Sequence, residues 1–420
     1  MTRSSVLLPR PAPSRSARAT AIWLALALAL STGCAGDVYG GAERDEVDRA
    51  LAIVPACRGA RAHDARVEAV ALYQAVKIPL YADGAWLEER EVPIIAGKKA
   101  LVRVFVRPDA GWTPRKLRAV LRLRHGDHVA RREDARVLRD APTDADLAST
   151  FNFDVAPDLI TPDARVSVAL EEADCPLSPA DEKRAGDAVV EPLRAEERGT
   201  LRVVLVPMRV GTRVPVLTES TVTHITDALR AFFPVPDVEV RVDQVIDGEP
   251  VVGPGQQDAS QWRAMLDRVH AHRGFRAPEP DVYYVGVFQP APTRAAYCAG
   301  GCTLGNAHQT SPSMVSRRHA VVAFFGDEMT GESVAHELGH AHGLGHAPCA
   351  GGAKMVGQDP DYPDELGRIG EWGWDTRTSA LIAPAARDFM SYCGPYGISA
   401  YHYGKLAART RVIDRVPRAP

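Results

Sequence analysis

The sequence of 420 residues predicts an α+β protein, with an all-β domain followed by a mixed α/β domain. Two patterns lead to this prediction. Apolar and polar residues alternate with a period of two between residues 66 and 175, as in half-buried strands. From residue 199 onward, short apolar runs alternate with stretches of helical periodicity, as in a sheet that helices cover.

Residues 1–33 have the features of a signal peptide for export. Four arginines and no acidic residues accompany an apolar run, AIWLALALAL, that is too short to span a bilayer as a permanent helix. The next residues, Ser31-Thr32-Gly33-Cys34, resemble a bacterial lipoprotein cleavage site, although Ser31 replaces the usual leucine. We expect lipidation of Cys34, which would anchor the chain to a membrane. Ordinary cleavage and secretion are the alternative.

The signal peptide and Cys34 lead us to expect a folded chain outside the cytoplasm. The expected location is the outer membrane or the cell surface, with a secreted or periplasmic protein as the alternative. Removal of residues 1–33 takes away four positive charges and changes the formal net charge from −3 to −7. This acidic balance offers no basic surface to nucleic acid. Residues 34–65 are small and polar and predict a tether.

Residues 66–175 predict a β-sandwich of immunoglobulin-like size, because alternating runs are separated by glycine and proline. Its expected role is to space or dock the second domain. Carbohydrate binding is an alternative, but the segment contains no obvious aromatic platform. Residues 176–198 are charged and contain prolines, which indicates a linker or a solvated helix.

The region from residue 199 to residue 325 predicts a mostly parallel sheet with backing helices. Strands are expected at residues 201–208, 238–244, 281–288 and 319–325, and helices at residues 219–233 and 259–272. Pro234 would end the first helix. Asp327 or Thr330 would cap a further helix that carries a histidine-rich segment.

That segment reads HELGHAHGLGH and places three histidines to share one zinc ion. Residues four apart lie on one helix face, so His336 and His340 can bind the same ion at roughly 2.0–2.1 Å. Gly343 suits a left-handed helix stop, after which His346 can approach as the third ligand. Three protein ligands leave one position to water, as in catalytic zinc sites. Glu337 lies beside the ligand face and is the expected general base.

The pattern His-Glu-x-x-His-x-x-Gly-x-x-His resembles the zinc motif of the metzincin metallopeptidases. Their second mark is a tight turn with a methionine, and the sequence DFMSYC offers Met390 for it. Tyr392 matches the tyrosine that astacin-like and serralysin-like metzincins place near the metal, where it can stabilise an oxyanion. The resemblance is sharp over residues 330–395. It implies a metzincin-like domain over residues 199–420, with an upper and a lower subdomain.

The cysteines also favour export. Six remain when Cys34 is set aside, and an even number in an exported chain suggests three disulfides. We favour the pairs Cys349–Cys393, Cys298–Cys302 and Cys57–Cys175. The first pair would link the segment after His346 to the methionine turn. An inhibitory thiolate of Cys57 on the metal is the alternative to the third pair.

Five further histidines are not assigned to the metal, because none has ligand spacing. His342 lies off the ligand face of the helix and is expected in solvent or behind the ligands. The other four are expected at the surface, in a helix that faces solvent or sheet, or in the C-terminal tail: His308, His319, His224 and His402.

These features predict a zinc metalloendopeptidase that hydrolyses extracellular or surface proteins and glycoproteins with a metal-activated water. Two alternatives remain. One is a zinc-containing surface binding protein or adhesin without activity, against which the intact motif with Glu337 argues. The other is a hydrolase of cell-wall peptides. The irregular residues 347–388 would shape the specificity pocket, and spacing rules do not reach that far.

Overall fold

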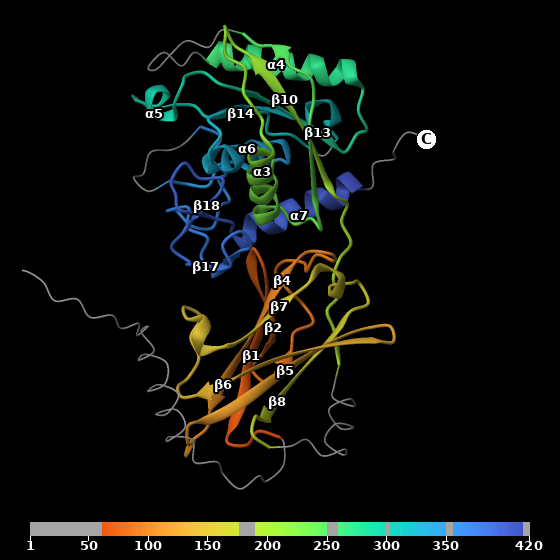
Figure 1. Cartoon of the computed structure of the whole chain (residues 1–420), viewed down its shortest axis with the longest axis vertical. Helices are drawn as coiled ribbons and strands as arrows, with labels where there is room; N and C mark the ends of the chain where they lie inside the picture. The colour runs from red at the N-terminus through yellow and green to blue at the C-terminus, as the bar shows by residue number, and fades with distance from the viewer. Residues whose placement is uncertain are drawn as a thin grey trace, which may run out of the picture. The chain divides into compact units, whose positions relative to one another are not determined.

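The computed structural model describes residues 61–175, 190–249, 259–299, 302–311, 313–349 and 356–414. The expected signal peptide, most of the tether, Cys34 and Cys57 lie outside these residues. Within the described ranges, no helix has the length and apolarity needed to cross a membrane. The fold is a mixed α+β fold, as predicted, with more strands than helices (Figure 1).

Two antiparallel sheets form the first half of the chain. The first contains β7 (Phe151–Val155), β4 (Ala100–Pro108), β1 (Ala65–Gln74) and β2 (Val76–Ala82), with β3 (Ala85–Trp86) paired to β2. The second contains β6 (His128–Leu138), β5 (Arg115–His125), β8 (Arg165–Glu172) and β9 (Glu191–Pro192). Val102 of the first sheet and Leu121 of the second belong to one hydrophobic core. The alternating apolar residues therefore face each other across two sheets, as the period of two requires.

Residues 190–198, the described part of the predicted linker, are not a solvated segment. β9 pairs with β8, and the backbone of Glu196 exchanges hydrogen bonds with Ile94 at 2.7 Å and Ala96 at 3.0 Å. Residues 190–198 are therefore attached to the β-rich half. The charges in this segment concealed the pairing, because a short edge strand needs little apolar sequence.

The second half is built on a six-stranded sheet with the order β11-β10-β13-β15-β14, and β12 pairs with β10. All its pairs are parallel except β14–β15, which confirms the predicted mostly parallel sheet. The strands are β10 (Leu201–Arg209), β11 (Val238–Val242), β12 (Ile246–Asp247), β13 (Val282–Phe288), β14 (Gly305–Ala307) and β15 (His319–Ala323).

Helices cover both faces of this sheet (Figure 1). The helix α4 (Ala259–Arg276) packs on the face that carries Val204, while α3 (Glu219–Phe232) and α6 (Glu328–Ala341) pack on the face that carries Val203. Adjacent strand residues point to opposite faces, so one strand serves both cores. The remaining short elements are α5 (Arg294–Tyr297), η1 (Leu147–Ser149), η2 (Pro157–Leu159) and η3 (Val315–Arg317).

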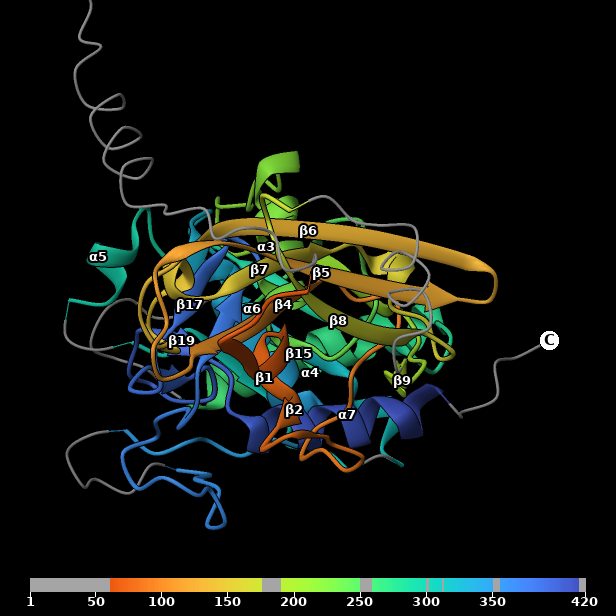
Figure 2. The same cartoon turned by 90° about the horizontal axis from the view of Figure 1, so that it is seen from below.

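The C-terminal segment contributes to both halves. The strands β18 (Arg387–Asp388) and β19 (Tyr396–Gly397) pair with each other, and α7 (Ala400–Asp414) lies beside β2 (Figure 2). The strands β16 (Gly373–Asp375) and β17 (Ala380–Ile382) extend the first sheet at β2, where the Trp374 amide donates to the Ala75 carbonyl at 2.9 Å. Trp374 is buried with Tyr73 and Phe105. The predicted boundary at residue 199 therefore does not separate two self-contained domains.

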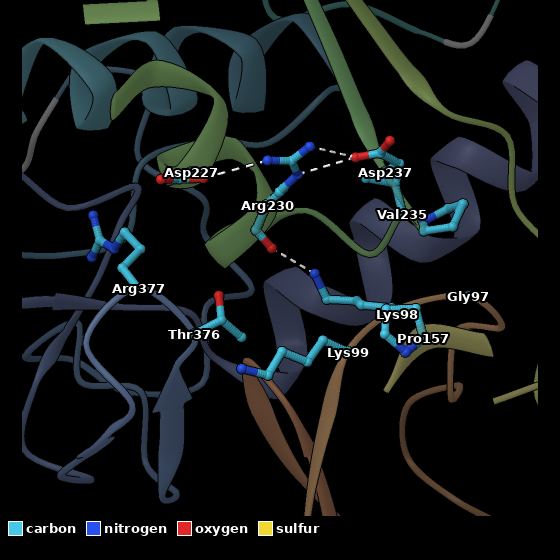
Figure 3. A pocket seen from close by; sticks show the side chains of 11 residues that line it. Gly97, Lys98, Lys99, Pro157, Asp227, Arg230, Val235, Asp237, Thr376 and Arg377 are labelled. Atoms are coloured by element: carbon cyan, nitrogen blue, oxygen red, sulfur yellow. Dashed lines mark hydrogen bonds and ion pairs between the residues drawn. The ribbon is translucent and has the colours of Figure 1, made fainter. Parts of the chain in front are cut away.

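A cavity of about 550 Å³ lies where the first sheet meets α3, and no histidine of the motif lines it (Figure 3). Lys98 at its edge is buried, and its Nζ donates to the carbonyls of Arg230 at 2.5 Å and Phe233 at 3.0 Å. These carbonyls belong to the C-terminal end of α3. The last carbonyls of a helix have no partner within the helix, so the hydrogen bonds from Lys98 join the β-rich half to the helix that packs on α6.

Candidate metal site

The helix α6 begins and ends where the sequence predicts. Asp327 is the N-cap, and its side chain accepts from the Thr330 amide at 3.1 Å. Gly343 follows the helix with a φ of 94°, and a Cβ atom there would lie 2.8 Å from the Thr310 carbonyl oxygen. Only glycine meets both conditions without strain. The chain then turns back and brings His346 to the face of α6 that carries the other two histidines.

The three predicted ligands converge. Suitable ring nitrogens of His336, His340 and His346 all lie within 4.8 Å of one another. The Nε2 atoms of His340 and His346 are 2.9 Å apart. Nitrogen ligands around a tetrahedral zinc ion are roughly 3.3 Å apart, from metal–nitrogen distances of about 2.0–2.1 Å. Small side-chain shifts would therefore accommodate an ion.

Each of the three rings is fixed by a second hydrogen bond. Each Nδ1–H donates to a backbone carbonyl, from His336 to Phe389 at 2.9 Å, from His340 to Leu344 at 2.8 Å and from His346 to Val356 at 2.6 Å. A carbonyl only accepts, so the proton is on Nδ1 and the lone pair is on Nε2. This is the arrangement of metal-binding histidines with oriented rings, and the donor set fits a divalent metal ion.

Burial keeps these imidazoles neutral. Desolvation lowers the pKa of His336 to about 4 and that of His340 well below its ordinary value. Desolvation also lowers the pKa of His346. Neutral imidazole is the form that ligates metal, so the site is ready for a cation at neutral pH.

Glu337 lies between the helix and the edge strand β14. Its side chain is buried, and a Cβ atom added to Gly305 of β14 would overlap its carboxylate. Burial raises the pKa of Glu337 to about 8. The expected base thus lies next to the ligands in an apolar setting, close to the edge of the sheet.

Met390 lies directly under the histidines. It is fully buried, and a Cβ atom on Gly339 would collide with its sulfur. Its carbonyl accepts from the Ala347 amide at 3.1 Å, which ties the methionine turn to the segment after His346. Tyr392 is 63% exposed, with its ring centroid 4.6 Å from that of His346. Burial, with the charge of Glu337, raises the pKa of Tyr392.

Sequence reasoning missed a buried pair that holds the methionine turn. Asp388 is fully buried and accepts from the Met390 amide at 2.9 Å, from the Ser399 hydroxyl at 2.6 Å and from His402 Nδ1 at 2.8 Å. His402 was expected in the tail, but it is fully buried because α7 packs against the turn. The signal available was an aspartate two residues before the predicted turn methionine.

Two of the predicted disulfides are present. Cys349 is bonded to Cys393 with a Cα–Cα distance of 5.6 Å, and Cys298 is bonded to Cys302 at 4.7 Å. Cys175 is also disulfide-bonded, whereas the predicted partner Cys57 lies outside the described residues. The first bond braces the segment after His346 against the methionine turn, as predicted.

The other histidines stay outside the metal cluster, but His319 is not at the surface, where it was expected. His342 is buried, donates from Nδ1 to the Leu338 carbonyl at 2.7 Å and stacks on Tyr283. His319 is buried because β15 is an inner strand with helices on both faces. His308 is half-buried, and His224 is exposed on α3.

Residues 320–394 match the family model of Peptidase M66. A search of the curated proteins finds no match. Among solved structures, the crystal structure of metalloproteinase-II from Bacteroides fragilis is similar, with 11% identity, coverage of 80% of this chain and 87% of that chain, and a TM-score of 0.28. That likeness is too low to carry an argument. The matched segment contains all three histidines of the cluster, Glu337 and Met390. The family match therefore supports a metallopeptidase. The three-histidine cluster of this chain is compatible with a metal ion.

Proposed function

We propose that the protein is a zinc-dependent metalloendopeptidase of the metzincin type that cuts extended segments of extracellular or surface proteins. The observation that carries the proposal is the convergence of three neutral imidazoles, each fixed through Nδ1, beside the buried Glu337. Three nitrogen ligands with one open position suit zinc in a hydrolase. When bound, zinc polarises the scissile carbonyl and lowers the pKa of water.

Each side chain near the proposed metal ion has its own role in the reaction. Glu337 is the general base that takes the proton from the attacking water and passes it to the leaving amine. Tyr392, whose phenol is protonated at neutral pH, donates to the oxyanion of the tetrahedral intermediate. Met390 and Gly339 hold the floor of the site and take no part in proton transfer.

The strand β14 is proposed to bind the substrate backbone. It is the last strand of the six-stranded sheet, it pairs only with β15 among the described residues, and Gly305 touches Glu337. An extended peptide can add to such an edge through main-chain hydrogen bonds. This geometry favours unfolded or loop segments of proteins as substrates.

The test compares the full chain with Glu337→Gln, and uses Glu328→Gln as the matched control on the exposed first turn of α6. We expect Glu337→Gln to retain one zinc ion per chain by elemental analysis and to lose at least about 10²-fold in casein cleavage. The control should cut at the wild-type rate. Cleavage by Glu337→Gln at that rate would remove Glu337 as the base.

Casein and peptidoglycan, tested as two separate substrates, distinguish the alternatives. A surface binding protein would retain casein uncut with full zinc, and a cell-wall hydrolase would release peptides from peptidoglycan only.

We also propose a lipid anchor on Cys34. Cys34→Ser should move the protein from the membrane fraction to the soluble fraction, and retention in the membrane fraction would contradict the anchor.

A further inference from the structure

Three buried arginines lie near the first residues of β13: Arg273 donates to the Val282 carbonyl, Arg318 donates to the Pro280 carbonyl, and Arg409 lies close to Tyr283. Arg273 of α4 is 7% exposed, Arg318 at the start of β15 is 0% exposed and Arg409 of α7 is 5% exposed. Within the described ranges, no carboxylate forms an ion pair with any of them. Guanidinium groups remain protonated in proteins, so this part of the core contains three positive charges without a negative partner.

Backbone and hydroxyl oxygens satisfy only part of each guanidinium group. Arg318 donates from Nη1 to the Pro280 carbonyl, and Arg409 donates from Nη2 to the Ser311 carbonyl at 2.8 Å. The donors that have no partner in the described structure are Nε of Arg273, Nε and Nη2 of Arg318, and Nε and Nη1 of Arg409. A buried donor without an acceptor is costly, and a buried charge is more costly still.

The three groups belong to one cluster around Tyr283. The guanidinium carbon of Arg318 lies 5.8 Å from the Tyr283 ring centroid, and the Tyr283 ring stacks on His342 at 4.5 Å. Burial raises the pKa of Tyr283 to about 12, against the charges of Arg318, Arg409 and Arg273. The Tyr283 phenol is therefore neutral, and the imidazole of His342 carries no negative charge, so neither ring neutralises the guanidinium groups.

We propose that this arginine cluster, Arg273, Arg318 and Arg409, binds a small inorganic anion of the size of chloride. The anion accepts hydrogen bonds from the free guanidinium donors and neutralises part of their charge. Arg409 also donates to the Thr310 hydroxyl at 3.3 Å, and that hydroxyl donates to the Ala341 carbonyl at 2.6 Å. The anion therefore supports the C-terminal end of α6.

The test follows thermal unfolding of the full chain in sodium chloride and in sodium gluconate at equal ionic strength. Gluconate is the control anion because it is much larger than chloride. We expect chloride to raise the unfolding temperature saturably, by about 2 °C or more. In Arg318→Met the difference between the two salts should vanish, while Arg317→Met, an exposed neighbour, should retain it. A full chloride effect in Arg318→Met, or none in wild type, would overturn the proposal.

Crystals of the wild-type chain grown with bromide give a second measurement that does not depend on a variant folding. We expect an anomalous bromide peak in contact with the guanidinium groups of Arg318 and Arg409. Ordered water at these donors and no peak would overturn the site.

Discussion

Gly339 and Met390 are in direct contact, and this contact sets the height of the methionine turn under the histidines. An alanine at position 339 would place its Cβ against the sulfur of Met390, so this fully buried side chain would have to shift. Overpacking of this kind costs about 1–3 kcal/mol. We expect Gly339→Ala to lower the free energy of unfolding by that amount, measured by urea denaturation, and to weaken zinc binding.

The control for this substitution is Gly274→Ala. Gly274 lies in α4 with no atom within 4 Å of an added Cβ. Alanine there should stabilise the protein by about 0.5–1 kcal/mol through helix propensity. Equal behaviour of the two variants would show that the contact with Met390 does not constrain the turn.

Asp388 and His402 make stability depend on pH. Burial would raise the pKa of Asp388, but the charge and hydrogen bonds of His402 outweigh it and lower this pKa below 3.8. Burial likewise opposes protonation of His402, yet Asp388 and Asp359 raise its pKa above 6.5. The contribution of Asp388 is therefore lost as pH falls through its folded pKa, and that of His402 is lost as pH rises through its own.

Both contributions are complete between the two unfolded pKa values, from about pH 4 to about pH 6.5. We expect the difference in urea midpoint between chelator-treated wild type and Asp388→Asn to be largest there, because the buried metal-site histidines destabilise both proteins alike as pH falls. Asp388→Asn should cost about 3 kcal/mol in this window, because it leaves a buried imidazolium unpaired. Asp361→Asn, at an exposed position, should leave the profile unchanged. An unchanged profile in Asp388→Asn would contradict the role of the pair.

The helices and parallel strands of the second half were predictable because each carries its own periodicity and caps. The helix α3 stops before Pro234, and α6 starts at Asp327. The strands β16 and β17 were not predictable, because three residues carry no period and their partner β2 lies almost 300 positions away in the chain. The three histidines and Glu337 were predictable because they are close together in the sequence. Asp388 and the three buried arginines meet only through tertiary structure.

The disulfide between Cys349 and Cys393 closes a loop of 44 residues, and that between Cys298 and Cys302 closes one of four. A longer loop restricts the unfolded chain more. We expect the double serine variant of the first pair to lose about 4 kcal/mol and that of the second pair about 2 kcal/mol, in the loop-entropy model. Chemical denaturation with and without zinc measures both. A larger loss from the short loop would contradict this order.

The two halves of the protein are expected to depend on each other for stability. A fragment of residues 199–420 would expose Trp374 and the free edge of β16, which the first sheet buries in the full chain. It should therefore unfold at a lower temperature than residues 61–420, or aggregate, by scanning calorimetry and light scattering. Trp374→Ala in the longer chain should reproduce part of the loss, about 3 kcal/mol. A fragment as stable as the longer chain would show that the shared sheet contributes nothing.

The pairing of β16 with β2 also imposes an order on biogenesis. A ribosome makes β2 almost 300 residues before β16, so the end of β2 at Val76 waits unpaired while the rest of the polypeptide emerges, although β3 pairs with the other end at Tyr81 and Ala82. An open edge is a template for intermolecular pairing, so this nascent chain has a long interval of exposure to aggregation. Its closure coincides with the arrival of residues 373–393, which also deliver the methionine turn. Completion of the sheet and assembly of the catalytic centre are therefore late events of the same stage of synthesis.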